Sequence, residues 1–102
     1  SATGRGVAFP HSISKEINSL VCILGISENG ILYGENDVHP CHIILLSLSP
    51  IDKTNIHRKF ISRFRLLLAD SKIKDSIIHA DSPIALETII KNWETKDLEE
   101  DV

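Results

Sequence analysis

His11 is the residue of this 102-residue chain whose surroundings best suit chemistry. It directly follows Pro10, at the end of a short apolar segment over residues 7–9, with Gly4 and Gly6 just before that segment. Proline restricts the backbone beside the imidazole, and nearby glycines let another molecule approach closely. A neutral imidazole is a good nucleophile near neutral pH, because its reference pKa is about 6.5. The spacing alone does not distinguish such a nucleophile from an ordinary loop histidine.

His57 is the second candidate, because it falls in the first turn or so of a helix predicted over residues 54–69. A helix N-terminus presents unpaired N–H groups and a positive partial charge, which keep a histidine neutral and attract an anion such as a phosphoryl group. Arg58 and Lys59 add positive potential within a locally basic segment, residues 53–65. That segment is either a solvated helix face or a docking surface for an acidic partner. His57 itself could equally be a surface histidine at the helix edge.

Three neighbouring residues, His39, Cys41 and His42, have side chains that could ligate zinc. In a strand, positions 39 and 41 share one face and position 42 points to the other, so at most two of these ligands converge. We therefore expect no metal, and a His/Cys metal-binding module is the weakest of three functional hypotheses. No cofactor is expected either, since the chain has no P-loop, no G-x-G-x-x-G and no G-x-S-x-G.

The elements that must position these histidines follow from the apolar pattern. Strands are predicted at 7–9, 20–26, 31–33 and 42–48, with a polar loop over 12–19, a turn at Asn29-Gly30 and a buried central strand at 42–48. Helical spacing takes over in the second half, with a helix over 54–69, a short helix capped by Asp70-Ser71 and a last helix beginning at Ser82-Pro83. The pattern predicts an α/β domain with a small mixed β-sheet flanked by helices.

Composition and charge exclude several classes. The chain is 42% hydrophobic, too apolar for a disordered protein, and no apolar run is long enough to cross a membrane. Residues 91–102 carry two lysines and five acidic residues, which account for the whole formal net charge of −3. We expect one domain over residues 1–93 and an acidic tail over 94–102. The neutral body argues against nucleic acid as a partner, and two cysteines without a signal peptide predict a cytoplasmic protein.

A family resemblance combines these motifs. Residues 6–11 read Gly-Val-Ala-Phe-Pro-His and resemble the G-(I/V)-A-(I/F)-P-H motif of fructose/mannitol-type enzyme IIA domains of the bacterial phosphoenolpyruvate phosphotransferase system, which include nitrogen-regulatory IIA proteins. Residues 37–43 resemble the family's D-x-x-P-V-(D/H)-(L/I) stretch. Ser49-Pro50 stands where the family usually has Ala-Pro, and His57 follows at the spacing of the family's second histidine. The segments 68–70 and 81–83 are also similar, so the resemblance covers residues 1 to about 93.

The resemblance implies a phosphotransferase with a phosphohistidine intermediate. His11 would accept a phosphoryl group from an HPr-type carrier, with His57 beside it, and pass the group to an enzyme IIB domain or use it as a signal. Arg5, Arg58 and Lys59 are the candidate partner-docking residues. The alternative is a non-catalytic regulatory domain that binds, or is fused to, a transporter or regulator. The chain lacks methionine, so Ser1 is not expected to be the natural start. In the family, a further N-terminal segment brings an arginine toward the site.

Overall fold

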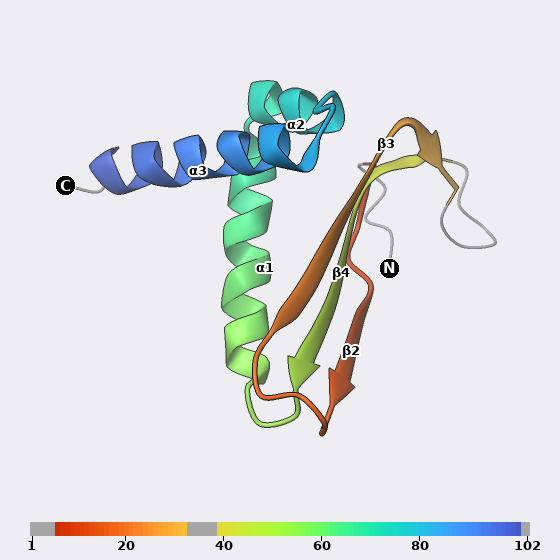
Figure 1. The fold of residues 1–102 in the computed structure, drawn as a ribbon, viewed down its shortest axis with the longest axis vertical. Coiled ribbons are helices and arrows are strands. Elements are labelled where there is room, and N and C mark those ends of the chain that lie inside the picture. Colours follow the sequence, from red (N-terminus) through yellow and green to blue (C-terminus); the bar gives the residue numbers. More distant parts are fainter. Residues whose placement is uncertain (1–5, 33–38, 101–102) are drawn as a thin grey trace. The chain divides into compact units, whose positions relative to one another are not determined.

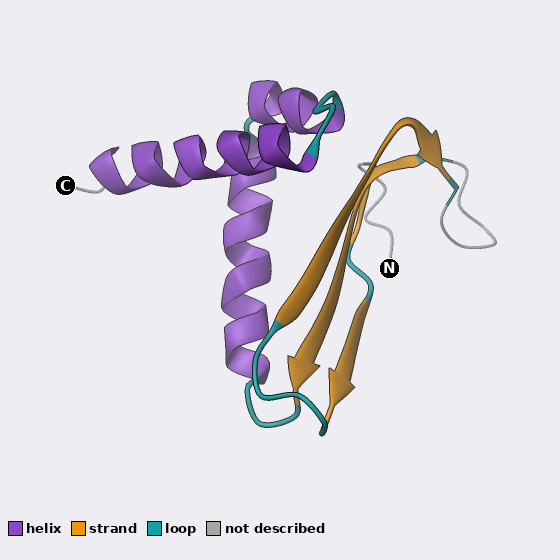
Figure 2. Cartoon of the chain, in the orientation of Figure 1, coloured by secondary structure: helices purple, strands orange, loops and turns teal. Residues whose placement is uncertain are grey.

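Strand β4 (Cys41–Pro50) is the centre of the sheet in the computed structural model, which describes residues 6–32 and 39–100. Two strands, β1 (Val7–Ala8) and β2 (His11–Ser14), pair in parallel with successive parts of one edge of β4. Strand β3 (Val21–Ile31) pairs antiparallel with β4 along the other edge. Figure 1 shows β4 between β2 and β3. Three helices follow the strands, α1 (Thr54–Ala69), α2 (Ser71–Ile78) and α3 (Pro83–Glu100), so the predicted mixed α/β class is confirmed (Figure 2).

The two faces of β4 differ in burial. Alternate residues on one face are at most 2% exposed: Cys41, Ile43, Leu45, Ser47 and Ser49. The residues between them are half-buried, except Leu46, which is 47% exposed. Successive side chains of a strand point to opposite faces, so one face of β4 belongs to the core and the other is partly open. The predicted central position of the strand is confirmed, but the expectation of full cover on both faces is wrong for the described residues.

β3 is one long edge strand, where the sequence predicted a buried strand, a turn and a second short strand. Ile23 is 62% exposed, and exposed and half-buried residues alternate along the first part of β3. Asn29-Gly30 does not reverse the chain: the register moves from Ile26 opposite Ile43 to Ile31 opposite Cys41, so extra residues are accommodated as a bulge. The Gly30 N–H donates to Ser27 Oγ at 3.0 Å inside this bulge. Tyr33, the end of the predicted second strand, lies outside the described residues.

β2 occupies part of the segment that the sequence predicted as a polar loop. Residues 11–14 pair with residues 47–50 of β4, and main-chain bonds extend the pairing at both ends, from Ser47 N to the Pro10 carbonyl at 2.9 Å and from Ile51 N to the Ser14 carbonyl at 3.1 Å. The composition of His-Ser-Ile-Ser gives little sign of a strand. Pairing with the neighbouring central strand overrides that weak local preference.

The chain forms two compact units, Ser1–Ser62 and Arg63–Val102. In the second unit, Asp70 caps α2 by accepting from Lys72 N and Ile73 N, and Ser82 Oγ accepts from Ala85 N at 3.1 Å to cap α3. Both caps match the sequence prediction. Counting only the described residues, none of the helices is long and apolar enough to span a membrane.

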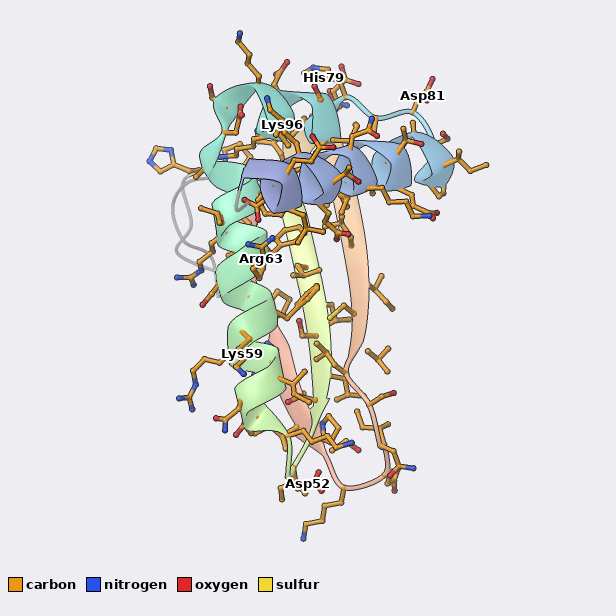
Figure 3. The ribbon with its side chains drawn as sticks, turned by 90° about the vertical axis from the view of Figure 1, so that its left-hand side faces the viewer. Asp52, Lys59, Arg63, His79, Asp81 and Lys96 are labelled. Atoms are coloured by element: carbon orange, nitrogen blue, oxygen red, sulfur yellow. The ribbon has the colours of Figure 1, made fainter. Side chains whose placement is uncertain are left out.

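The C-terminal residues continue α3. Arg63, labelled on α1 in Figure 3, forms a 2.8 Å ion pair with Asp97, and its guanidinium carbon lies 4.8 Å from the centre of the Trp93 ring. The helix runs to Glu100, so the predicted tail begins within helical structure. The domain boundary at residue 93 stays a prediction.

We predict that Gly30→Ala destabilises the protein and that Gly25→Ala does not. Gly30 has φ +85°, and a Cβ there would lie 2.5 Å from the Pro40 Cβ, whereas a Cβ on Gly25 would be 3.7 Å from the Ile44 carbonyl oxygen, an ordinary contact. Urea titration should show that Gly30→Ala lowers the free energy of unfolding by about 2 kcal/mol. The Gly25→Ala change should stay within about 0.5 kcal/mol. Equal losses in the two variants would contradict the bulge geometry.

Candidate functional site

His11 is the first residue of β2, and the parallel register sets the direction of its side chain. It lies opposite Ser47 in β4, so its imidazole is on the face that also carries Ser47 and Ser49. The preceding Pro10 carbonyl accepts from Ser47 N, which fixes the backbone where the histidine begins. The His11 side chain is nevertheless exposed. The backbone of His11 is therefore fixed, while its ring is accessible to another molecule.

Ser49 holds one nitrogen of the His11 ring. The His11 Nε2 and Ser49 Oγ atoms are 2.7 Å apart, within hydrogen-bonding distance. Ser49 is 0% exposed and belongs to the buried face of β4. Sequence reasoning missed this residue. Its place one strand away from His11 depends on the β2–β4 register, which the sequence does not reveal, although the period of two along β4 could have put Ser47 and Ser49 on one face.

His57 stacks on His11. The two ring centroids are 3.6 Å apart and the ring planes differ by 9°. His57 lies near the N-terminus of α1, three residues after Thr54, and is half-buried. The structure thus brings together the two histidines that the sequence singled out.

The polar environment of His57 is incomplete. Its Nε2 atom is buried and has no hydrogen-bond partner among the described residues. Burial, and secondarily the charge of His11, lower the pKa of the His57 imidazole from its ordinary value of 6.5. The ring is therefore neutral at pH 7. A buried N–H or lone pair without a partner is costly, so this atom is suited to a polar group that arrives with another molecule.

A short turn joins β4, which carries Ser49, to α1, which carries His57. β4 ends at Pro50 and α1 begins at Thr54, with Lys53 N donating to the Pro50 carbonyl at 3.1 Å. The Lys53 side chain donates from Nζ to the Asn18 carbonyl at 2.8 Å, which ties this turn to the connection between β2 and β3. The turn therefore fixes where α1 starts, and hence where His57 lies.

The basic candidates are less closely tied to the site. Arg58 and Lys59 directly follow His57 on α1, and both are exposed; Figure 3 shows Lys59 on the helix and Asp52 in the turn before it. Neither basic side chain forms an ion pair with another described residue. Arg5 lies outside the described residues.

The three residues considered for zinc do not form a ligand set. Cys41 is buried, His39 is exposed, and His42 Nδ1 is 3.0 Å from the Ser27 carbonyl oxygen, to which it donates. Within residues 6–32 and 39–100, no group of three His, Cys, Asp or Glu side chains could hold a metal ion. The His42 ring packs against the β3 bulge, since a Cβ on Gly30 would lie 3.1 Å from the His42 Cε1 atom.

Comparison with known proteins places the chain in a family. The family model for EIIA 2 of the phosphoenolpyruvate-dependent sugar phosphotransferase system matches residues 1–93. The chain belongs to that family. This EIIA domain is 28% identical over 87 residues to the fructose-specific EIIABC component of the Bacillus subtilis phosphotransferase system, which covers 85% of the chain and 14% of that protein.

A solved structure supports the same fold. The nitrogen regulatory protein IIA-Ntr from Neisseria meningitidis matches the EIIA domain with a TM-score of 0.70 and 22% sequence identity. The match covers 85% of the chain and 58% of the IIA-Ntr chain. The chain thus spans a small part of one relative and little more than half of the other.

We predict that NMR titration will find the His57 pKa below 6.5 and that His11→Gln will raise it. The substitution removes the charge of His11 and opens the face of the His57 ring to water, and both changes favour the imidazolium. In the wild type, the unfolded chain binds this proton at a higher pH than the folded protein does. The stability that neutral His57 retains above pH 6.5 is therefore lost as the pH falls through the folded pKa. A His57 pKa unchanged by His11→Gln would contradict the stacked geometry.

Proposed function

We propose that this EIIA domain is a phosphocarrier in which His11 accepts a phosphoryl group and passes it on. The observation that carries the proposal is the stacked pair of histidines. An exposed His11, held by Ser49, lies against a half-buried His57 whose Nε2 has no partner among residues 6–32 and 39–100. Phosphoryl transfer needs an in-line nucleophile and stabilisation of the phosphoryl oxygens, and little covalent chemistry beyond that. The donor is an HPr-type phosphocarrier. The acceptor is a cysteine of an enzyme IIB domain, or the phosphorylation state itself acts as a signal.

The transfer is an exchange between two imidazoles. A lone pair of the His11 ring forms a bond to phosphorus while the bond from phosphorus to the donor's imidazole nitrogen breaks. The donor ring keeps that electron pair and leaves as a neutral imidazole. The same step runs in reverse toward the acceptor thiolate. We place this relay in the cytoplasm, because a chain with only two cysteines favours a reducing compartment.

His57 stabilises the phosphoryl group in this proposal. Its lowered pKa keeps the ring neutral at pH 7, and in the tautomer with the ring hydrogen on Nε2 that nitrogen donates a hydrogen bond to a phosphoryl oxygen. That bond would satisfy the one buried nitrogen that lacks a partner among the described residues. The N-terminus of α1, close to His57 in the chain, adds a positive partial charge that favours the anion.

Incubation with phosphoenolpyruvate, enzyme I and HPr tests the proposal. We expect an acid-labile phosphoryl group on the wild type and none on His11→Ala, because the nucleophile is gone. We expect His57→Ala to slow labelling by roughly 10- to 100-fold, because it removes a hydrogen bond to a charged group. Labelling of His11→Ala at the wild-type rate would overturn the assignment. A folded wild type that takes no label would favour the alternative, a regulatory domain that binds its partner without chemistry.

The exposed Arg58 and Lys59 are proposed to dock the carrier. Surface charges act mainly on association, so Arg58→Glu with Lys59→Glu should slow labelling on the order of tenfold at low salt, and less at high salt. The matched control is Lys72→Glu with Lys96→Glu, which reverses two exposed charges on α2 and α3. The initial rate of labelling, measured at a low and a high ionic strength, gives the size of the change in each double variant. Equal slowing in both double variants would show that net charge, and not a docking surface, is responsible.

A further inference from the structure

We propose that the Ser49 hydroxyl restrains His11 in the resting protein, so that the hydrogen bond between them must open before His11 takes a phosphoryl group. The inference rests on the proposed phosphocarrier function and concerns how that function is held back. It starts from the 2.7 Å separation between Ser49 Oγ and His11 Nε2. Ser49 is then a positioning residue whose contact slows the reaction, and its removal should make the transfer faster.

The contact closes Nε2 to an electrophile whichever atom donates the hydrogen bond. Where the hydroxyl donates, the Nε2 lone pair is directed at the hydroxyl hydrogen. Where the imidazole donates, Nε2 carries a hydrogen and has no lone pair in the ring plane. An imidazole nitrogen attacks through that lone pair, so neither arrangement lets Nε2 react until the contact opens.

Burial of the hydroxyl stabilises the contact. Ser49 is 0% exposed, whereas the His11 side chain is exposed. When the two separate, water can replace Ser49 as the partner of the imidazole, but water cannot reach the hydroxyl. A buried polar group that loses its partner is costly, so the cost of opening falls on Ser49. The resting protein is therefore expected to hold the contact for most of the time.

The stack with His57 keeps the His11 ring in place independently of Ser49. The ring centroids are 3.6 Å apart and the planes differ by 9°, so His57 covers a ring face and leaves the in-plane lone pairs uncovered. The pairing opposite Ser47 fixes the backbone of His11. Loss of the Ser49 hydroxyl therefore releases one nitrogen while the ring remains oriented. The two contacts have opposite effects: His57 orients the ring, and Ser49 restrains it.

The restraint belongs to this chain and not to the fold in general. Ser49 stands where the family that the sequence resembles usually has alanine. Alanine provides the same backbone and a small side chain without a hydroxyl, so Ser49→Ala is a mild substitution in β4. It removes the hydrogen bond and leaves the strand pairing intact.

Opening precedes the transfer and exchanges no atom with Ser49. A hydrogen carried by Nε2 first moves through water to Nδ1, which leaves the Nε2 lone pair free. That lone pair forms the bond to phosphorus, and the bond from phosphorus to the donor's imidazole nitrogen breaks with its electron pair left on the donor. The Ser49 hydroxyl keeps its hydrogen throughout.

Ser47 is the matched control. Both serines are buried on the same face of β4, with 1% exposure for Ser47 and 0% for Ser49. The Ser47 Oγ atom lies 3.6 Å from Cys22 Sγ, and the contact to the imidazole comes from Ser49. Ser47→Ala and Ser49→Ala therefore remove the same group from the same strand, and Ser49→Ala alone removes the restraint.

Diethyl pyrocarbonate tests the restraint without any carrier protein. A neutral imidazole nitrogen attacks one carbonyl carbon of this reagent and displaces ethyl carbonate, which decomposes to carbon dioxide and ethanol. Trypsin separates His11, in residues 6–15, from His57, in residues 54–58, so mass spectrometry gives the rate of modification at each histidine. We expect His11 to be modified about three- to tenfold faster in Ser49→Ala than in the wild type or Ser47→Ala, the effect of one neutral hydrogen bond.

Phosphoryl labelling from HPr that has been phosphorylated in advance tests the consequence for transfer. The initial rate should rise by about three- to tenfold in Ser49→Ala and stay at the wild-type value in Ser47→Ala. A loss of structure would slow labelling, so a faster rate distinguishes a restraint from a packing role. Thermal unfolding of both variants, with similar midpoints, completes the comparison.

The outcomes separate this inference from the proposed function. Equal or slower modification of His11 in Ser49→Ala would overturn the restraint, and so would labelling that occurs but is not faster in Ser49→Ala. Faster modification in Ser49→Ala, together with no phosphoryl label on any of the three proteins, would overturn the phosphocarrier function and support the hydrogen bond as a restraint on Nε2.

Discussion

The parallel pairing of His11 with Ser47 is the constraint on which the site depends. It puts the imidazole on the buried face of β4, next to a hydroxyl that water cannot reach. A slip of one residue in this register would turn His11 to the opposite face of the sheet and away from both of its partners. Little in β2 itself fixes the register, since three of its four residues are exposed and the fourth, Ser14, is half-buried. The main-chain hydrogen bonds from Ser47 and Ile51 at the two ends of β2 therefore help to fix the register.

Electrostatics gives the histidine pair its chemical character. Two imidazoles stacked at 3.6 Å do not easily both carry a positive charge, and burial favours the neutral form of His57. A neutral His57 can donate to an anion without repelling a positively charged His11 ring after transfer. The cost of this arrangement is a buried His57 nitrogen without a hydrogen-bond partner in the part of the chain that the structure describes. Such a local deficit is common where a fold is prepared for a ligand.

The sequence was informative where the physics is local. Residues a few positions apart are enough to predict three kinds of feature: the bounds of the helix at 54 and 69, the caps at Asp70 and Ser82, and the central apolar strand. His11 and His57 were found because proline, glycine and a helix start mark their positions. The errors concern long-range pairing: β2 forms only because β4 is beside it, Asn29-Gly30 makes a bulge because β4 continues opposite it, and β3 is exposed because it is an edge strand. Ser49 was missed for the same reason, since its partner is 38 residues away.

The short turn between β4 and α1 has a consequence for how the site can change. Ser49 and His57, the two residues that contact His11, belong to one stretch of chain, residues 49–57, that includes the turn. Because Ser49 is held in β4 and His57 in α1, the turn between them sets where the stacked ring lies relative to the hydroxyl. The length of the turn is then as much a part of the chemistry as the side chains are. An insertion there would remove the site while leaving every one of its residues in the sequence.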